Sequence, residues 1–204
     1  MLRVALTGAV ATGKSYVLDR MRRRGIACID SDELAHGVMV AGTEATTAIA
    51  ARFGDVLAPD GSVDRRKLGS IVFADRAARR VLEGIVHPAV YRAIDAGLNG
   101  FERLGESSVA VVDIPLLYET GHGSEFGKVI ATFCPEPLQR ARLLERGLSL
   151  EAANQRMAAQ MRPEEKASRA DFIVRTDGTF EEADSQVDAV LDSLRAIASK
   201  LRTL

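Results

Sequence analysis

The sequence predicts an α/β protein with a parallel sheet that is covered by helices on both faces. Two continuous apolar runs, 108–113 and 129–133, do not alternate with polar residues and are therefore typical of strands that are buried on both sides. Residues 2–7, 14–24 and 26–30 follow one another with the patterns of a strand, a helix and a strand. This order predicts a βαβ unit, in which the two strands are parallel.

The helix predicted over 14–24 ends at Gly25, a residue that suits a helix C-cap, and its last residues are arginines that suit a helix C-terminus. Residues 31–105 contain no convincing strand. They have the patterns of several helices, with a turn at 59–62 and a long helix from about 75 to 104. This segment is therefore a helical insertion in the sheet.

The C-terminal third repeats this alternation. Residues 136–169 are predicted to be helical and are rich in Arg and Glu, residues 172–174 are predicted to form the last strand, and 180–202 an amphipathic final helix. The predicted divisions are a core of 1–31, 106–135 and 170–204, a helical insertion of 32–105, and a helical lid of 136–169.

The bulk composition limits the classes of function. Hydrophobic residues make up 47% of the 204 residues, enough for a sizeable core, and no apolar run is long enough to cross a membrane. The net charge of −1 gives no overall basic field for nucleic acid. The 2 Cys and 3 His form no cluster with metal-ligand spacing. We expect a cytoplasmic protein with buried thiols.

The turn after the first predicted strand carries the strongest motif, a glycine, four residues, then Gly-Lys-Ser. It is formed by Gly8, Ala9, Val10, Ala11, Thr12, Gly13, Lys14 and Ser15. In such a P-loop, backbone N–H groups and the following helix N-terminus hold phosphates, the lysine reaches the β- and γ-phosphates, and the serine hydroxyl binds Mg²⁺. The motif predicts ATP binding on a three-layer P-loop NTPase fold with a five-stranded parallel sheet.

Acidic residues follow two of the predicted strands, at the sheet edge where ligands of parallel sheets gather. Asp30 and Asp32 follow the second strand, and Asp32 is either a base that orients an attacking hydroxyl or the N-cap of the next helix. Asp113 ends the run 108–113 and is either a Mg²⁺ group or a turn residue before Pro115. These positions do not decide between the alternatives.

The lid is rich in arginine, with Arg140, Arg142, Arg146 and Arg156 on predicted helices. Arg142 and Arg146 are four residues apart and share one helix face. They either stabilise the charge on a transferring phosphoryl group or belong to a solvated face with nearby glutamates. The pattern leaves both readings open.

A series of short blocks resembles the dephospho-coenzyme A kinase family over nearly the whole chain. Besides the P-loop, the blocks are Asp30-Ser31-Asp32, Val63-Asp64-Arg65, Ile71-Val72-Phe73, Leu82-Glu83, His87-Pro88, Pro115-Leu116-Leu117-Tyr118-Glu119, Gln155-Arg156, Gln160, Glu165-Lys166 and Ala170-Asp171. The resemblance implies ATP-dependent phosphorylation of the ribose 3′-hydroxyl of dephospho-coenzyme A, the last step of coenzyme A synthesis. It also implies a substrate-binding role for the insertion.

The resemblance also implies roles for single residues. It implies that Asp32 is the base, that Lys14 and Arg142 are catalytic groups, and that Ser15 and Asp113 bind Mg²⁺. It places Arg146, Arg156, Thr176 and Gly178 at the nucleotide. It places His87, Leu116, Leu117 and Tyr118 at the acceptor. The two leucines and the tyrosine are alternatively plain core, and His87 before Pro88 alternatively packs inside a helix bend. Oligomeric state stays open between a monomer and a small homo-oligomer.

Three departures from the family pattern affect the site. The loop has Ala9-Val10-Ala11-Thr12 where the family usually has Gly-Ile-Gly-Ser, Gly147 follows Arg146 without the usual Asp, and Thr176 replaces the usual Asn. The alternatives to this family are a kinase of another small acceptor, such as a nucleoside monophosphate, and a nucleotide-dependent switch. The chain lacks the Asp-x-x-Gly and Asn-Lys-x-Asp sequences of a GTPase switch.

Overall fold

The chain forms two compact units in the computed structural model, which describes residues 1–105 and 107–201. One unit combines 1–29 with the chain from Gly100 onward, and the other is Asp30–Asn99. The second unit overlaps the predicted insertion of 32–105. Two predicted boundaries, the start of a core segment at 106 and the end of the last helix at 202, lie outside the described residues.

The first unit is built on a five-stranded sheet in the order β2-β3-β1-β4-β5. The strands are β1 (Leu2–Gly8), β2 (Ala27–Asp30), β3 (Val109–Asp113), β4 (Lys128–Phe133) and β5 (Phe172–Arg175). β1 runs parallel to β3 and β4, and β4 runs parallel to β5. The predicted strands and the α/β class are confirmed, because continuous apolar runs mark strands that are covered on both faces.

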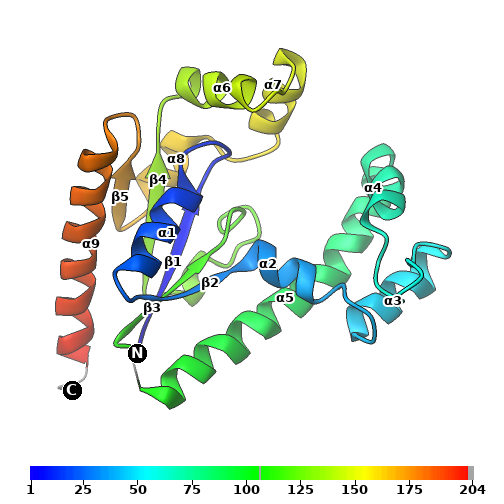
Figure 1. Cartoon of the computed structure of the whole chain (residues 1–204), viewed down its shortest axis with the longest axis horizontal. Helices are drawn as coiled ribbons and strands as arrows, with labels where there is room; N and C mark the ends of the chain where they lie inside the picture. Colours follow the sequence, from blue (N-terminus) through cyan, green and yellow to red (C-terminus); the bar gives the residue numbers. More distant parts are fainter. Residues whose placement is uncertain (106, 202–204) are drawn as a thin grey trace. The chain divides into compact units, whose positions relative to one another are not determined.

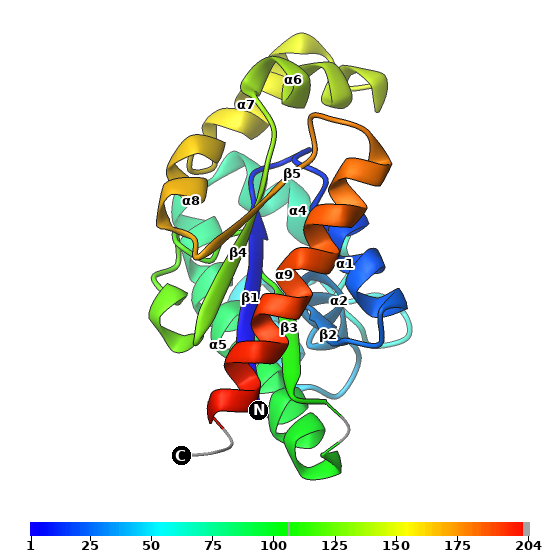
Figure 2. The ribbon, with the colours of Figure 1, turned by 90° about the vertical axis from the view of Figure 1, so that its left-hand side faces the viewer.

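Helices cover both faces of this sheet. The helices of this unit are α1 (Lys14–Arg23), α6 (Glu136–Glu145), α7 (Leu150–Ala158), α8 (Pro163–Arg169) and α9 (Phe180–Leu201), with a 3₁₀ turn η1 (Gly123–Glu125), and those on the faces are α1, α8 and α9. α1 and α9 pack against each other and against β1, whereas α8 contacts β4 and β1 from the other side (Figures 1 and 2). The helices α6 and α7, within the predicted lid, lie beyond the end of β4 (Figure 1).

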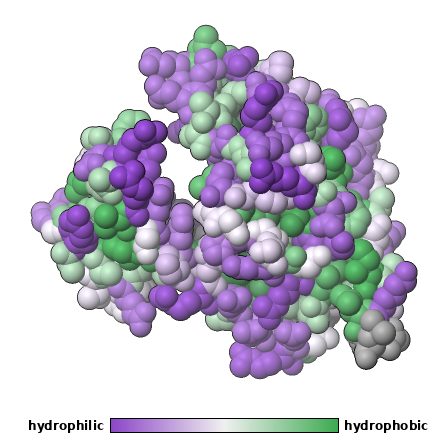
Figure 3. Space-filling view, turned by 180° about the vertical axis from the view of Figure 1, so that it is seen from behind, coloured by the Kyte–Doolittle hydropathy of each residue, from purple (hydrophilic) through white to green (hydrophobic). Residues whose placement is uncertain are grey.

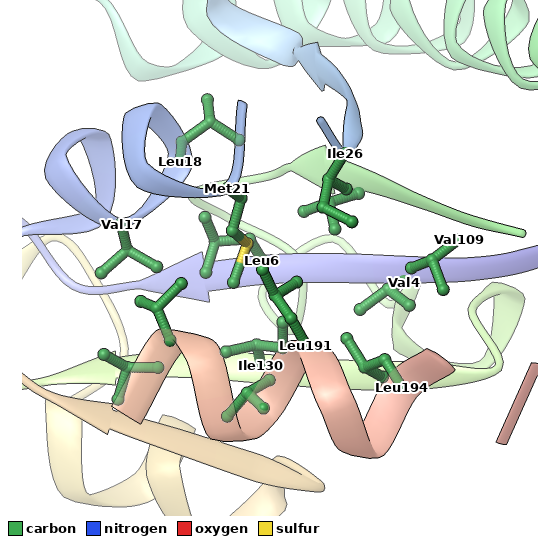
Figure 4. Packing of buried hydrophobic residues seen from close by; sticks show 14 of the residues in the cluster. Val4, Leu6, Val17, Leu18, Met21, Ile26, Val109, Ile130, Leu191 and Leu194 are labelled. Carbon is green, nitrogen blue, oxygen red and sulfur yellow. The ribbon is translucent and has the colours of Figure 1, made fainter. Parts of the chain in front are cut away.

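The core of this unit lies between the sheet and the helices α1 and α9. Leu6, Ile130, Leu191 and Leu194 meet there and are at most 1% exposed (Figure 4). Full burial of one such side chain stabilises a fold by roughly 1.5–3 kcal/mol. Because α9 supplies the buried stripe Val187, Leu191 and Leu194 at helical spacing, its predicted amphipathic pattern is confirmed.

The second unit is helical, as predicted. It holds α2 (Ser31–Gly37), α3 (Glu44–Phe53), α4 (Arg65–Ala74) and most of α5 (Arg76–Leu104), with the buried cluster Ile49, Val56, Val63 and Leu68. Its described residues form no strand beyond one isolated bridge between Leu57 and Val63. The predicted turn at 59–62 is present, with Gly61 in the left-handed conformation at φ +81°.

The surface carries charged and polar side chains over most of the face in Figure 3, with hydrophobic residues in small groups. Among the helices of the described residues, none combines the length and the apolar character of a membrane span. Cys28 and Cys134 are free thiols, and burial raises the pKa of both, that of Cys28 to about 12.

The high pKa of Cys28 predicts slow alkylation. We expect iodoacetamide at pH 8 to modify Cys28 about 1000-fold more slowly in the native protein than in the urea-unfolded chain, because a pKa of about 12 against 9.0 reduces the thiolate by about that factor. Peptide mass spectrometry after timed quenching measures both rates. A native rate within tenfold of the unfolded rate would contradict the buried environment.

Candidate active site

The phosphate loop begins at the end of β1, beside β4. Their register pairs Gly8 with Thr132. A Cβ atom on Gly8 would lie 2.1 Å from Thr132 Oγ1 and 2.6 Å from Thr12 Oγ1, so any other residue would force both threonine side chains to shift. The Thr12 and Thr132 hydroxyls are hydrogen-bonded to each other at 2.7 Å and are fully buried. The loop is therefore anchored to the sheet by the glycine that the motif requires.

Four successive carbonyl groups of the loop are hydrogen-bonded to side chains. The bonds run from Thr12 Oγ1 to Ala9 O (2.7 Å), Gln139 Nε2 to Val10 O (2.6 Å), Arg142 Nη1 to Ala11 O (3.1 Å) and Thr176 Oγ1 to Thr12 O (2.9 Å). Each carbonyl dipole that is held in this way is directed at a protein donor and away from a bound phosphate. This leaves the negative end of these peptide dipoles out of the anion site, as a phosphate loop requires.

Both backbone polar groups of Val10 are hydrogen-bonded to residues of the predicted lid. Gln139 of α6 donates to the Val10 carbonyl oxygen, and the Val10 N–H donates to Gln160 Oε1 at 2.7 Å. Gln139 is 1% exposed and shares the buried face of α6 with Leu143. A phosphate that uses the Val10 N–H must displace the Gln160 oxygen. Sequence reasoning gave neither glutamine a role, although Gln139 lies on the apolar stripe of its helix.

Ala11 has a positive φ of 60°, a conformation that costs an L-residue with a Cβ roughly 1–2 kcal/mol. Gly13, also in the loop, has φ +81° at no such cost. The loop thus keeps the backbone path of a glycine-rich turn although an alanine stands at one of the positions where the family usually has glycine. This strain is local, because Ala11 is buried and its carbonyl is held by Arg142.

Lys14 and Asp113 are brought together at the start of α1. Lys14 Nζ lies 2.5 Å from Asp113 Oδ2, and the side chains are 14% and 3% exposed. The β1–β3 register sets this contact, because it pairs Leu6 with Asp113 and so places the carboxylate at the end of β1 from which the loop departs. Asp113 therefore lies beside the lysine of the phosphate loop, and its role at Mg²⁺ stays a prediction.

Residues predicted at the nucleotide line one pocket of about 390 Å³. Arg142, Arg146, Thr176 and Gly178 contribute to it, together with Ala11, Gly13, Tyr16, Thr179, Phe180, Glu181 and Ala183. The rings of Tyr16 and Phe180 lie 4.9 Å apart, which offers an aromatic surface that sequence reasoning did not identify. Arg156 is exposed on α7 and does not line this pocket.

Arg142 and Thr176 join the pocket to the phosphate loop. Arg142 Nη1 donates to Thr176 Oγ1 at 3.1 Å, and Nη2 donates to Thr176 O at 2.5 Å. Thr176 in turn donates to Thr12 O and is buried. The Thr176 hydroxyl, which stands where the family usually has an amide, is therefore already hydrogen-bonded to Arg142 and to the phosphate loop.

The predicted acceptor residues of the segment after β3 differ in burial. Leu117 is fully buried, which matches the core alternative, whereas Leu116 and Tyr118 are partly exposed. Arg169 of α8 lies over the Tyr118 ring at 5.7 Å, and the ring contacts Gly123. Burial raises the pKa of the Tyr118 hydroxyl, which has no hydrogen-bond partner among the described residues.

Lys166 forms an ion pair with Glu119, a residue of this segment, in which the lysine is buried and the carboxylate is partly exposed. The Lys166 ammonium is completely buried and lies 2.8 Å from Glu119 Oε1. Desolvation lowers the pKa of Lys166, and Lys14 adds to this effect. Sequence reasoning gave the pair no role. A signal was present, because Pro163, Lys166 and Ala167 form the buried stripe of α8 and a lysine within such a stripe requires a partner.

Two predicted residues lie in the second unit. Asp32 is exposed in the first turn of α2, and Asp30, not Asp32, caps that helix by accepting hydrogen bonds from the Asp32 and Glu33 N–H groups. The N-cap alternative for Asp32 is therefore wrong. His87 is partly buried in α5, directly before Pro88, which lies inside the helix.

The profile of the family described as dephospho-CoA kinase matches residues 2–182. A dephospho-CoA kinase of Symbiobacterium thermophilum is 44% identical over 91% of this chain and 78% of its own length. TT1252 from Thermus thermophilus superposes with a TM-score of 0.80 and 30% identity over 95% and 97% of the two chains. Dephospho-CoA kinase from Campylobacter jejuni superposes with a TM-score of 0.72 and 28% identity, over 94% of this chain and 96% of its own.

The strained loop conformation predicts a stabilising substitution. We expect Ala11→Gly to raise the free energy of unfolding by about 0.5–1 kcal/mol, because relief of the left-handed alanine outweighs the added flexibility of the unfolded chain. Urea denaturation followed by circular dichroism measures the change. Ala9→Gly is the matched control, since Ala9 has no positive φ, and it should destabilise the protein. Equal losses in both variants would contradict the assignment of strain to Ala11.

Proposed function

The chain belongs to the dephospho-CoA kinase family, and from this premise we propose that it transfers the γ-phosphoryl group of ATP to the ribose 3′-hydroxyl of dephospho-coenzyme A. The products are coenzyme A and ADP. The observation that carries this proposal is the phosphate loop with its lysine held against Asp113, next to a pocket for a nucleotide base. This geometry supplies what phosphoryl transfer needs most, which is positioning and neutralisation of charge.

We propose that ATP lies along the loop with its base in the 390 Å³ pocket. The Lys14 ammonium then leaves Asp113 for the β- and γ-phosphates, which carry more negative charge than one carboxylate. Arg146 is exposed at the pocket, and Arg142 is held by Ala11 and Thr176. We infer that Arg142 acts by fixing the loop and its own charge beside the phosphates, while Arg146 is available to the nucleotide and Arg156 is available only if the lid moves.

Mg²⁺ is part of this proposal. The Ser15 hydroxyl is exposed at the start of α1, and the Asp113 carboxylate lies beside Lys14. Hydroxyl and carboxylate oxygens are the donors that Mg²⁺ prefers, together with phosphate oxygens and water, so the residues present fit the ion. When bound, the ion neutralises charge on the phosphates. The chain's own task is to hold its oxygen ligands in place.

Asp32 is the proposed base that accepts the proton of the acceptor hydroxyl. Its carboxylate is exposed, and because Asp30 performs the capping of α2, Asp32 is not required for that task. Among the contacts of the described residues, none is an ion pair of Asp32. A positioned base of this kind contributes roughly 10²- to 10⁴-fold to turnover.

The acceptor is proposed to bind against Leu116 and Tyr118, with His87 and the helical unit contributing to its recognition. Leu117 supports this wall from the core, as its full burial indicates. A cytoplasmic location, the absence of nucleic acid binding, and a monomer or small homo-oligomer stay predictions, of which the first is supported by the two free thiols.

The proposal predicts acceptor-dependent ADP release. Purified protein with ATP and Mg²⁺ should release ADP only when dephospho-coenzyme A is added, and coenzyme A should form in equal amount by mass spectrometry. Chelation of Mg²⁺ should abolish both. Turnover with nucleoside monophosphates but not with dephospho-coenzyme A would replace this substrate, and ATP binding with no acceptor at all would favour a switch.

Asp32→Asn is expected to lower kcat about 100-fold or more, because the amide cannot accept the proton. The dissociation constant of ATP, measured by calorimetry, should change less than twofold. Asp30→Asn is a matched control two residues away, since asparagine caps a helix as well as aspartate, and kcat should be nearly unchanged. Near-full turnover of Asp32→Asn would rule out Asp32 as the base.

A further inference from the structure

The buried lysine of α8 is the one fully buried cation among the described residues, and the mechanism above does not use it. Lys166 is 0% exposed, and its ammonium donates to the Pro115 carbonyl oxygen at 2.6 Å and to Glu119 Oε2 at 2.9 Å. Pro115 and Glu119 are the two ends of the segment that carries the proposed acceptor wall. A single ammonium group therefore binds both ends of this segment.

Further contacts secure both ends of the loop. Thr7, the second-to-last residue of β1, donates a hydrogen bond from its hydroxyl to the same Pro115 oxygen at 3.3 Å. At the other end, Glu119 Oε1 accepts a hydrogen bond from the Met161 N–H at 2.9 Å. Lys166 thus lies at the centre of a polar cluster that connects α8, the 115–119 segment and β1.

The same face of α8 also contacts the wall itself. Arg169 follows Lys166 by three residues, and its guanidinium lies over the Tyr118 ring at 5.7 Å. One helix thus holds the two ends of the segment with its lysine and covers the tyrosine between them with its arginine. α8 lies within the predicted lid, but it packs on β4 and β1, so it offers a fixed support for the segment.

Stability alone gives little reason for this arrangement. Burying the Lys166 ammonium costs desolvation energy, its carboxylate partner stays 21% exposed, and well-packed apolar residues of similar volume are often as stable or more stable. An apolar side chain at 166 would fill the space but could not bind a carbonyl oxygen and a carboxylate at once. The property that only the ammonium provides is a defined conformation of residues 115–119.

We propose that Lys166 is a positioning residue for the acceptor: by binding Pro115 and Glu119 together it fixes the wall formed by Leu116 and Tyr118. This inference rests on the proposed function and adds to it a residue that acts through the wall without touching either substrate. Lys166 thus has a different proposed task from Lys14, which serves the phosphates. The two ammonium groups are nevertheless close enough for Lys14 to contribute to the lowered pKa of Lys166.

Lys166→Met tests the assignment. We expect the KM for dephospho-coenzyme A to rise on the order of 10-fold or more, the loss that follows when hydrogen bonds to a charged group are removed. The dissociation constant of ATP, measured without acceptor, should stay within about twofold. Arg24→Met is the matched control, because it removes an ion pair of 2.6 Å with Asp188 in the same unit, where α1 meets α9 and away from the wall. It should leave both constants unchanged.

A second variant keeps the test valid if Lys166→Met does not fold. Glu119→Gln retains an oxygen for Lys166 and removes the charge, and it should raise the acceptor KM with little effect on ATP. Equal increases in the acceptor KM and in the ATP dissociation constant would overturn the proposal, since they would place Lys166 at the phosphates. An unchanged acceptor KM in a folded variant would also overturn it. Failure of the wild-type protein to use dephospho-coenzyme A would instead refute the proposed function.

Discussion

The close approach of β1 and β4 at Gly8 and Thr132 is the constraint on which the site depends. A side chain at Gly8 would meet the Thr132 hydroxyl at 2.1 Å, so the strand must end there in a glycine. The Thr12–Thr132 hydrogen bond then returns the loop to the sheet, and the four outward carbonyls follow from that path. The β1–β3 register places Asp113 at the same edge. Lys14, the first residue of α1 after the loop, therefore lies within reach of the Asp113 carboxylate.

Each of two buried or nearly buried cations is paired with a carboxylate around this edge. Lys14 is matched to Asp113, and Lys166 is matched to Glu119, each with less than 15% exposure of the cation. A buried ion pair adds little to stability, but loss of one partner is costly, so such pairs fix geometry more than they strengthen the fold. In the function proposed above, the first pair serves the phosphates and the second supports the acceptor wall.

The sequence predicted the architecture well because its signals are local. Continuous apolar runs identify buried strands, and the spacing of Val187, Leu191 and Leu194 identifies the buried face of α9. The phosphate loop is equally local. By contrast, the partners of Arg142, and the capping of α2 by Asp30 in place of Asp32, depend on contacts or backbone angles that spacing does not encode. Lys166 was missed for the same reason, since its partners lie about 50 residues away.

The hydrogen bonds of Arg142 have a consequence for how this sequence can change during evolution. Ala11 and Thr176 both depart from the usual family residues, and one guanidinium nitrogen, Nη1, bonds to both. The bond to residue 11 is accepted by its backbone carbonyl oxygen, which every residue retains, whereas the bond to residue 176 is accepted by a side-chain hydroxyl. A change of side chain at 11 therefore leaves its bond to Arg142 in place, while a change at 176 keeps this bond only if the new side chain is also an acceptor. A chimera that replaced the segment around 176 would have to bring such an acceptor with it, although 165 positions of the chain separate 176 from 11.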